Sequence, residues 1–400
     1  MTEDTSGTTG LAPPLWLIFS ITVTGIMANT LISASIPDIL HDFGEPDGSA
    51  GLLVAASPAP GIVLAPIMGV LADRYGRRAV LVPSLLAFGL AGLGAALAPS
   101  FELLLAARFA QGAGSASLIG LSVTIISDHW EGNDRARFIG WNSAVLTVCI
   151  ALFPAIGGFL TELGTWRYAY IPMLWSLVCA GLIASRLSGG GTGDGRITDR
   201  IRIARHGLRQ PIIFAPTLLA FVIFALIFGL FLTAMPLLLE DRFGLSAGER
   251  GLVIVVPALS ATVAALLLGR TRKALGGRRL TLLGTAVLAI SYAAVGWAAS
   301  ITVLLVASLA YGWAEGATIP TLQDLVAGNA PGEARAAVVS IYTSFLRAGQ
   351  TIGPLVVGAL LGVIETNEAF FYGGAILALA AVAQFLVPAE RIIGRSEPAT

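Results

Sequence analysis

The feature that most constrains this chain is its series of long apolar stretches, which lack the polar alternation of a barrel strand. A lipid bilayer admits only helices or closed barrels, because every backbone amide must find its partner inside the protein. Each stretch is long enough for the helix of about 20 residues that crosses the hydrocarbon core. The charged fraction is 12%, against about 25% in soluble proteins. The sequence therefore predicts an all-α membrane protein.

The apolar stretches form two sets of six. We expect transmembrane helices at residues 14–37, 50–72, 79–98, 101–127, 136–161, 166–186, 212–236, 247–270, 280–299, 301–328, 335–363 and 369–388. A polar stretch, rich first in glycine and then in arginine, separates the sets. We therefore predict twelve transmembrane helices in two pseudo-symmetric six-helix bundles. Residues 1–187 form the N-terminal bundle, 188–210 a cytoplasmic linker and 211–400 the C-terminal bundle.

The two sets also repeat each other at a constant shift in residue number. Many transporters consist of two similar halves, so such a repeat is informative about architecture. The shift aligns Gly69 with Gly269, Gly76 with Gly276, Arg78 with Arg278, Gly112 with Gly312, and Pro154 with Pro354. These pairs occupy matching places in the two sets, and we infer an internal duplication.

The basic residues are distributed very unevenly. Of the 24 lysines and arginines, all but five lie in the loops of one side, in or beside the linker, or in the C-terminal tail. The exceptions are Arg167, Arg242 and Arg250 in opposite loops, with Arg108 and Arg347 inside spans. Cytoplasmic loops carry an excess of these residues. We therefore place both termini in the cytoplasm and expect a multi-pass protein of the bacterial inner (plasma) membrane.

The sequence predicts no cofactor, no metal site and no enzyme. His41, His129 and His206 lie apart, in loops or at span ends, and Cys149 and Cys179 lie singly in apolar stretches. No glycine-rich loop continues into the Gly-Lys-Ser/Thr that binds ATP phosphates, and no hydrolase nucleophile elbow stands out. A formal charge of +0 gives no basic face for nucleic acid. The energy for transport must then come from an ion gradient.

Four segments resemble signatures of the major facilitator superfamily. Residues Gly69–Arg78 (GVLADRYGRR) match every defining position of its loop 2/3 signature, Gly-x-Leu-Ala-Asp-Arg-x-Gly-Arg-Arg. Residues Arg108–Gly114 (RFAQGAG) resemble its span 4 signature, and Thr165–Tyr168 (TWRY) resemble the element that opens span 6. Residues Phe153–Gly158 (FPAIGG) resemble the span 5 antiporter signature, with Phe153 in place of its first glycine. The resemblance implies the major facilitator fold and points to its twelve-span drug:proton antiporters.

The resemblance implies a gating cluster around loop 2/3. In the proteins that this chain resembles, the loop aspartate faces the start of span 11, and a later arginine pairs with an acid that ends span 4. These residues are Asp73, Arg77 and Asp128 here. Arg78 completes the signature, and Gly69 permits two helices to approach closely. A purely topological role for the cluster is the alternative.

A second group of gating candidates lies in spans 5 and 11. Pro154, Gly157 and Gly158 belong to the antiporter-like signature of span 5. Gly353 and Pro354 belong to a related segment, GQTIGPLVVG, in span 11. The resemblance implies that both segments take part in gating.

Arg108 is the strongest functional candidate. A charge inside a span costs about 2.5–3.5 kcal/mol on insertion scales and usually marks a substrate or ion pathway. At 100° per residue, Arg108 shares one side of span 4 with Gln111, Ser115 and Ser122, and we predict that this side faces a water-filled substrate cavity. Asn29 of span 1 is the polar candidate opposite. The alternative is an arginine that binds backbone carbonyls and holds helices together.

Glu315 is the one acid near the middle of a span. Burial favours the neutral form of a carboxyl, so Glu315 could carry the coupled proton near neutral pH. Arg347 of span 11 lies at a similar depth, and an ion pair between the two residues would keep the acid ionised. Both possibilities stay open on sequence alone.

The substrate prediction rests on charge and on aromatic residues. Two interior arginines against one interior acid repel a permanently cationic substrate, so neutral or anionic amphiphiles fit better. Phe224 and Phe228 of span 7, with Tyr311 and Trp313 of span 10, are candidates for the lining of an apolar pocket. Contact with lipid or with neighbouring helices is the alternative for each of them.

The predicted function is secondary transport by alternating access around a site near the middle of the membrane. Proton-coupled efflux of amphiphilic small molecules is the preferred mode, with protons and the lipid bilayer as partners. A monomer is expected, since one chain holds both halves. The alternatives are a uniporter or symporter of a small metabolite, a lipid translocase, and a transporter-like sensor, the last two without proton coupling.

Overall fold

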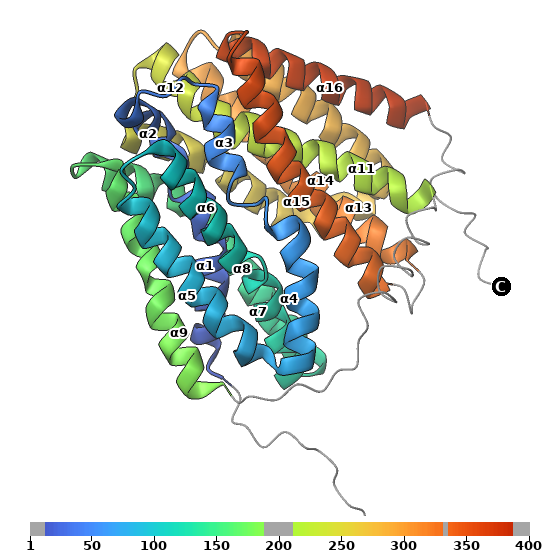
Figure 1. Cartoon of the computed structure of the whole chain (residues 1–400). Coiled ribbons are helices and arrows are strands. Elements are labelled where there is room, and N and C mark those ends of the chain that lie inside the picture. The colour runs from blue at the N-terminus through green and yellow to red at the C-terminus, as the bar shows by residue number, and fades with distance from the viewer. Residues whose placement is uncertain (1–12, 188–210, 331–334, 387–400) are drawn as a thin grey trace, which may run out of the picture.

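The computed structural model describes residues 13–187, 211–330 and 335–386, which form helices joined by short turns, without a strand in these ranges (Figure 1). This confirms the predicted all-α class. The predicted linker, residues 188–210, lies outside the described residues, as do both termini.

The first half is described over residues 13–187 and contains short as well as long helices. They are α1 (Leu15–Thr30), the 3-10 segment η1 (Ser33–Ser35), α2 (Ile36–Phe43), α3 (Ser49–Ala55), α4 (Gly61–Tyr75), α5 (Arg77–Ala96), α6 (Phe101–Ser115), α7 (Leu118–His129), α8 (Gly132–Glu162), the 3-10 segment η2 (Trp166–Leu174) and α9 (Trp175–Arg186). Several spans of this half are therefore interrupted.

The second half contains longer helices. They are α11 (Pro211–Leu226), the π-helix η3 (Ile227–Ala234), α12 (Met235–Phe243), α13 (Ala247–Trp297), α14 (Ile301–Asn329), α15 (Arg335–Leu361) and α16 (Thr366–Leu386). The 51 residues of α13 cover two of the predicted spans.

Ten stretches of the described residues are long and apolar enough to cross a membrane. They correspond to eleven of the twelve predicted segments, two of which are merged, and the twelfth is interrupted. The predicted span 50–72 is divided between α3 and α4, and the spans 247–270 and 280–299 both lie in α13. The difference from the prediction therefore lies in how the helices are broken and joined.

Two of the interruptions lie at or beside prolines. Residues 56–60 (ASPAP) form a turn between α3 and α4, and Pro58 and Pro60 have no N–H to donate. Pro37 lies in the first turn of α2, where a missing N–H has no helical partner to lose.

Two pairs of glycines, equivalent under the sequence repeat, share a left-handed backbone. Gly44 and Gly244 end α2 and α12 with φ of 69° and 63°. Gly76 lies between α4 and α5 with φ of 92°, and Gly276 bends α13 with φ of 74°. Other residues are strained in this region because of the Cβ atom. The predicted duplication is therefore visible in the backbone.

The matching glycines of spans 4 and 10 make the same helix crossing in the two halves. A Cβ atom on Gly112 would lie 1.8 Å from the carbonyl oxygen of Ser57, and one on Gly312 would lie 2.0 Å from that of Pro257. Each glycine thus lets its helix touch the backbone of the span two before it in the chain. The acceptors are themselves equivalent positions of the repeat, which supports the duplication.

Buried hydrophobic residues form separate clusters in the two halves. The second-half cluster runs from Ile213 to Leu377 and includes one first-half residue, Ala34. One of the first-half clusters includes Leu237 of α12. The halves therefore share core residues where η1 meets α12, and Figure 1 shows α1–α9 grouped apart from α11–α16. The exact bundle boundaries, 1–187 and 211–400, stay a prediction.

The two sides of the molecule differ in how many arginines their loops carry. The arginine-rich side carries the loops that follow α4, α7 and the first part of α13. The arginine-poor side carries the ends of α2, α8 and α12 and the starts of α3 and α13. From the arginine-poor side, the ribbons of the two halves diverge toward the end of α4 and the start of α15 (Figure 1).

We predict that Gly276→Ala lowers stability by about 1–2 kcal/mol, because alanine is strained at a φ of 74°. The same substitution at Gly269 is the matched control. Neither glycine has another atom within 4 Å of an added Cβ, but only Gly276 has a positive φ. Thermal unfolding of the purified protein in detergent measures the difference. Equal melting temperatures for the two variants would contradict the strain argument.

Candidate functional site

Arg108 lies inside the first half on α6, with 0% of its surface exposed. Its Nε donates to the Leu53 carbonyl at 2.8 Å, and its Nη1 donates to the Ala28 carbonyl at 2.9 Å. Its Nη2 donates to Oδ1 of Asn29. These acceptors belong to α1 and α3, so Arg108 joins three helices. This geometry is the one expected if Arg108 holds helices together, which is the alternative to a role in the substrate cavity.

The rest of the Arg108 face is also packed against protein. Gln111 is fully buried and donates from Nε2 to the sulfur of Met173 at 2.9 Å. The hydroxyl of Ser122 accepts from Thr22 at 2.7 Å, and Ser115 is buried. Neighbouring helices therefore pack against this face in the described conformation, and its contact with a substrate cavity stays a prediction.

Glu315 and Arg347 do not pair in this conformation. Arg347 donates from Nη2 to the Ala116 carbonyl of the first half at 3.0 Å, and its guanidinium lies against Gly61. The ion pairs found among the described residues do not include one between Glu315 and Arg347. Arg347 therefore bridges the two halves, and Glu315 is not neutralised by it.

Glu315 is partly buried on α14, one turn after a buried tyrosine. That residue, Tyr311, stacks on Phe231 of η3, with ring centroids 4.8 Å apart and an interplanar angle of 11°. Its other neighbour is Tyr292 of α13, at 5.3 Å. Aromatic rings from three helices therefore surround the helix turn that carries the acid.

The remaining aromatic candidates lie beside a π-helix. Phe224 and Phe228 stack with centroids 6.3 Å apart, and both are partly buried. Phe228 lies in the π-helical segment Ile227–Ala234, and such segments are frequent at functional sites. Trp313 is partly buried and packs against the second-half core. Their contact with substrate stays a prediction.

The loop 2/3 cluster is formed as an ion-pair network. Arg77 donates from Nε to Oδ2 of Asp128 at 3.1 Å and from Nη1 to Asp73. The expected contact between the loop arginine and the acid of span 4 is present. Gly69, in contrast, makes no close helix approach in this conformation, because an added Cβ there would meet nothing within 4 Å. The start of span 11, which Asp73 is expected to face, directly follows residues 331–334, which lie outside the described residues. The gating role stays a prediction.

The glycine and proline candidates of spans 5 and 11 lie at helix crossings. A Cβ atom on Gly157 would lie 1.6 Å from the Leu31 carbonyl oxygen, and one on Gly353 would lie 1.9 Å from that of Ala225. These two crossings lie within single halves. A Cβ on Gly158 would lie 2.2 Å from the oxygen of Ala247, in the other half.

Two further crossings join the halves on the arginine-poor side with two-fold symmetry. A Cβ on Gly251 would lie 2.5 Å from the Pro154 carbonyl oxygen, and one on Gly51 would lie 2.3 Å from that of Pro354. The two glycines are equivalent positions of the sequence repeat, and so are the two prolines. The halves therefore close on this side through the same contact made twice.

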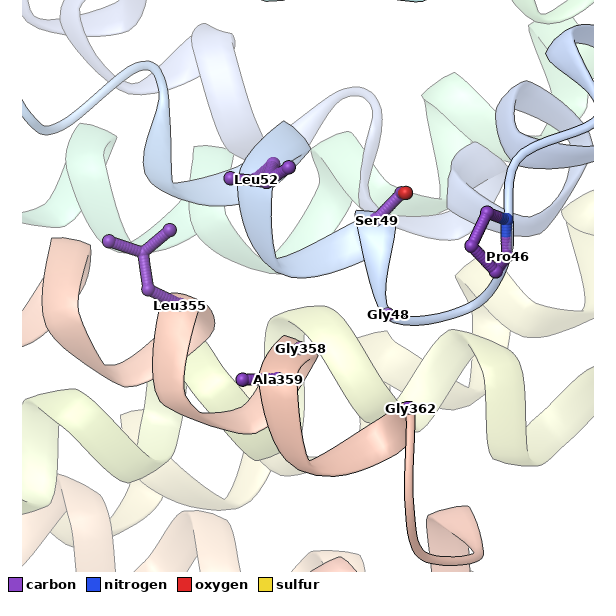
Figure 2. Close-up of a pocket in the computed structure, with 8 residues that line it drawn as sticks. All are labelled: Pro46, Gly48, Ser49, Leu52, Leu355, Gly358, Ala359 and Gly362. Carbon is purple, nitrogen blue, oxygen red and sulfur yellow. The ribbon is translucent and has the colours of Figure 1, made fainter.

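A groove of about 350 Å³ lies between α3 and α15 beside one of these crossings (Figure 2). Its lining is mostly small or apolar and consists of Pro46, Gly48, Ser49, Leu52, Leu355, Gly358, Ala359 and Gly362. None of the predicted cavity residues lies in it. The groove follows the seam between the halves and is distinct from the predicted substrate site.

Arg250 is a residue that the sequence reasoning missed. It is 1% exposed and donates from Nε to the Ala34 carbonyl of the first half at 2.9 Å. A signal was present, because Arg250 is one of three arginines outside the arginine-rich loops and spans. It also follows directly on the capping box formed by Ser246 and Glu249, which begins α13.

Comparison with known proteins agrees with this architecture. Multidrug resistance protein 1 of Bacillus subtilis is 24% identical over 378 residues, which cover 90% of this chain and 94% of that protein. An MFS-type transporter of Aspergillus terreus is 30% identical over 165 residues. That alignment covers 39% of this chain, and the chain spans only 24–29% of the length of the first curated relatives that it matches.

The fold also matches solved structures. A bacterial homolog of the human lysosomal transporter Spinster, in an inward-facing and unoccupied conformation, superposes with a TM-score of 0.74 and 18% identity. The match covers 96% of this chain and 98% of that chain.

Two bundles of apolar helices with charged residues inside them define a multi-pass membrane transporter rather than an enzyme. The sequence model of the Major Facilitator Superfamily matches residues 18–238 and 217–398. The chain belongs to this superfamily, which confirms the resemblance seen in its loop 2/3 signature.

We predict that Gly51→Val separates α3 from α15, because the new side chain would meet the Pro354 carbonyl oxygen. Cysteines at Leu52 and Leu355, which line the groove from the two helices (Figure 2), report the separation through a short bifunctional thiol reagent. The yield of cross-linked protein should fall severalfold.

Gly120→Val is the control, because an added Cβ at Gly120 meets nothing within 4 Å. Cys149 and Cys179 are first replaced so that the reagent finds only the new pair. An unchanged yield in Gly51→Val would mean that the crossing tolerates a side chain and does not set the closure.

Proposed function

We propose that this chain exports neutral or anionic amphiphilic small molecules in exchange for protons. We place it in the bacterial inner membrane with the arginine-rich side and both termini in the cytoplasm, because basic loops are retained on that side. With this orientation, the described conformation is closed toward the outside. The main functional support is the full-length similarity to a multidrug resistance protein of Bacillus subtilis.

The observation that carries the proton coupling is the environment of Glu315. The acid lies inside a span, among aromatic rings, and Arg347 points away from it to Ala116. An acid inside the bilayer without a neutralising arginine is costly to keep ionised, so it is suited to take up and release a proton. Both residues belong to the second half, so an approach of Arg347 to Glu315 would first require its side chain to leave the Ala116 carbonyl of the first half.

The substrate preference follows from the interior charges. Arg108 and Arg347 lie inside the spans, with Glu315 as the opposing acid. A permanent cation would meet this positive excess without a compensating acid, so neutral or anionic compounds are favoured. We place the substrate between Asn29 of the first half and Phe228 of the second.

The transport cycle that we propose requires the halves to rock about this site. With the cavity open outward, Glu315 takes a proton. When the arginine-poor side closes, as in the described conformation, the proton is released toward the cytoplasm and substrate enters. Arg108 keeps α1, α3 and α6 together as one moving body through its three hydrogen bonds. One chain holds both halves, so a monomer suffices.

A different coupling is the second candidate. Phe153 replaces a glycine of the antiporter signature, which favours a uniporter or symporter of a small metabolite. A lipid translocase or a transporter-like sensor without proton coupling would share the same fold, since fold alone does not determine function.

We predict that Glu315→Gln abolishes substrate-driven proton movement, because the amide cannot carry a proton at this position. The purified protein is reconstituted into liposomes, and a pH-sensitive dye reports proton flux on addition of neutral, anionic or cationic amphiphiles. The wild type should respond to neutral or anionic compounds, and the variant should fall to the level of protein-free liposomes.

The control is Glu368→Gln, which removes an exposed acid from the first turn of α16 in the same half. Transport that ignores the pH gradient and persists in Glu315→Gln would reject antiport and favour facilitated diffusion. A response confined to cationic compounds would reject the charge argument while leaving proton coupling intact.

A further inference from the structure

The arginine-poor side holds a charge cluster around a buried arginine, and this cluster joins the two halves. Its centre is Arg250, in the first turn of α13, whose N–H donates to the Ser246 carbonyl at 2.8 Å. The side chain is 1% exposed, so its charge is almost completely removed from water. A buried guanidinium is tolerated only where hydrogen-bond acceptors surround it.

The acceptors of Arg250 come from both halves. In the first half, Nε donates to the Ala34 carbonyl at 2.9 Å and Nη2 donates to Asp38. In the second half, Nη1 lies 3.0 Å from Oε1 of Glu240 and 3.3 Å from the Leu245 carbonyl. The two first-half acceptors belong to η1 and α2, which move with the other bundle.

A second polar contact lies beside this cluster. Glu162, the last residue of α8, accepts a hydrogen bond from the Gly248 N–H at 2.9 Å. Gly248 lies in the first turn of α13, where the helix dipole favours an anion. The N-terminus of α13 is therefore held by the first half through a cation on one side and an anion on the other.

The remaining arginines of this side bind within one half. Arg167 donates to Asp42 at 2.7 Å and to the Ala98 carbonyl at 3.2 Å, all in the first half. Arg242 donates to the Gly296 carbonyl at 2.9 Å, both in the second half. Their contacts do not depend on how the halves are oriented, whereas those of Arg250 do.

We propose that Arg250 is the latch of the arginine-poor gate: with Asp38 and the Ala34 carbonyl it stabilises the state in which this side is closed. Opening the side separates η1 and α2 from α13 and removes both acceptors. Interactions that exist in one state only shift the equilibrium between states, so the latch sets how much of the protein is closed here. Arg250 is a positioning residue in this role. The inference rests on alternating access but on neither substrate nor proton coupling.

Distance measurements between spin labels test the latch without any transport assay. One pair of cysteines replaces Leu163 and Val363, which are 74% and 79% exposed on the arginine-poor side in opposite halves. A second pair replaces Arg74 and Ala274, which are exposed on the arginine-rich side. The natural Cys149 and Cys179 are removed.

We predict that Arg250→Met moves the main population of the Leu163–Val363 pair to longer distances and that of the Arg74–Ala274 pair to shorter ones. Arg242→Met, which removes a guanidinium from the same side but within one half, should leave both distributions as in the wild type. The same distribution in wild type, Arg250→Met and Arg242→Met would reject the latch.

Asp38→Asn removes the charge of the acid that binds Arg250 with little change in side-chain shape. This variant also tests the latch if Arg250→Met does not fold. It should shift the same populations in the same direction. Because the two residues act through one contact, the double variant should shift no further than Arg250→Met alone. Additive shifts, or no shift in Asp38→Asn, would overturn the pairing. If the spin-label distances shift as predicted but the wild type shows no substrate-driven proton flux, only the proposed function is rejected.

Discussion

The structure depends on how backbone carbonyls are satisfied where helices break inside the bilayer. Each helix end leaves carbonyls without an intrahelical partner, and lipid offers none. Three arginines donate to carbonyls at such places. Two of them lie inside spans, with Arg108 bound to Ala28 and Leu53 and Arg347 bound to Ala116, and the third, Arg250 at the start of α13, binds Ala34. Ala28 and Leu53 lie in the last turns of α1 and α3, Ala34 lies in η1, and Ala116 directly follows α6. The N–H groups of these arginines satisfy carbonyls that the helix breaks leave free, and the same carbonyls stabilise the charged guanidinium groups.

Because of the two-fold repeat, the contacts between the two halves occur in equivalent pairs. The same glycine-to-proline crossing occurs twice, at Gly51 with Pro354 and at Gly251 with Pro154, so the two halves meet along two equivalent seams. Small residues at both seams allow backbone contact, which in a bilayer is favoured by packing rather than by the hydrophobic effect. A rocking movement of one half against the other would open both seams together. The separate hydrophobic clusters of the halves would survive such a movement.

The sequence was sufficient for the class of fold, because the length and apolarity of the spans depend on the bilayer alone. The contact between Arg77 and Asp128 was also predictable, since the family resemblance implies that the arginine of the loop 2/3 signature pairs with the acid that ends span 4. Arg108 was found as a buried charge, but its partners were not, because spacing along one helix does not report how closely α1 and α3 approach. Arg250 was missed for a similar reason. Its partner Asp38 lies 212 positions away in sequence, and no periodicity connects the two.

The charged clusters on the two sides differ in what they can control. Both acids bound by Arg77 belong to the first half, so these ion pairs can persist in any orientation of the halves. Arg250 binds Ala34 and Asp38 across the halves, so these contacts exist only while the arginine-poor side is closed. A contact made equally in two states shifts no population, however strong it is. It follows that the Arg77 pairs stabilise the first half itself, whereas the Arg250 contacts favour one arrangement of the two halves over the other.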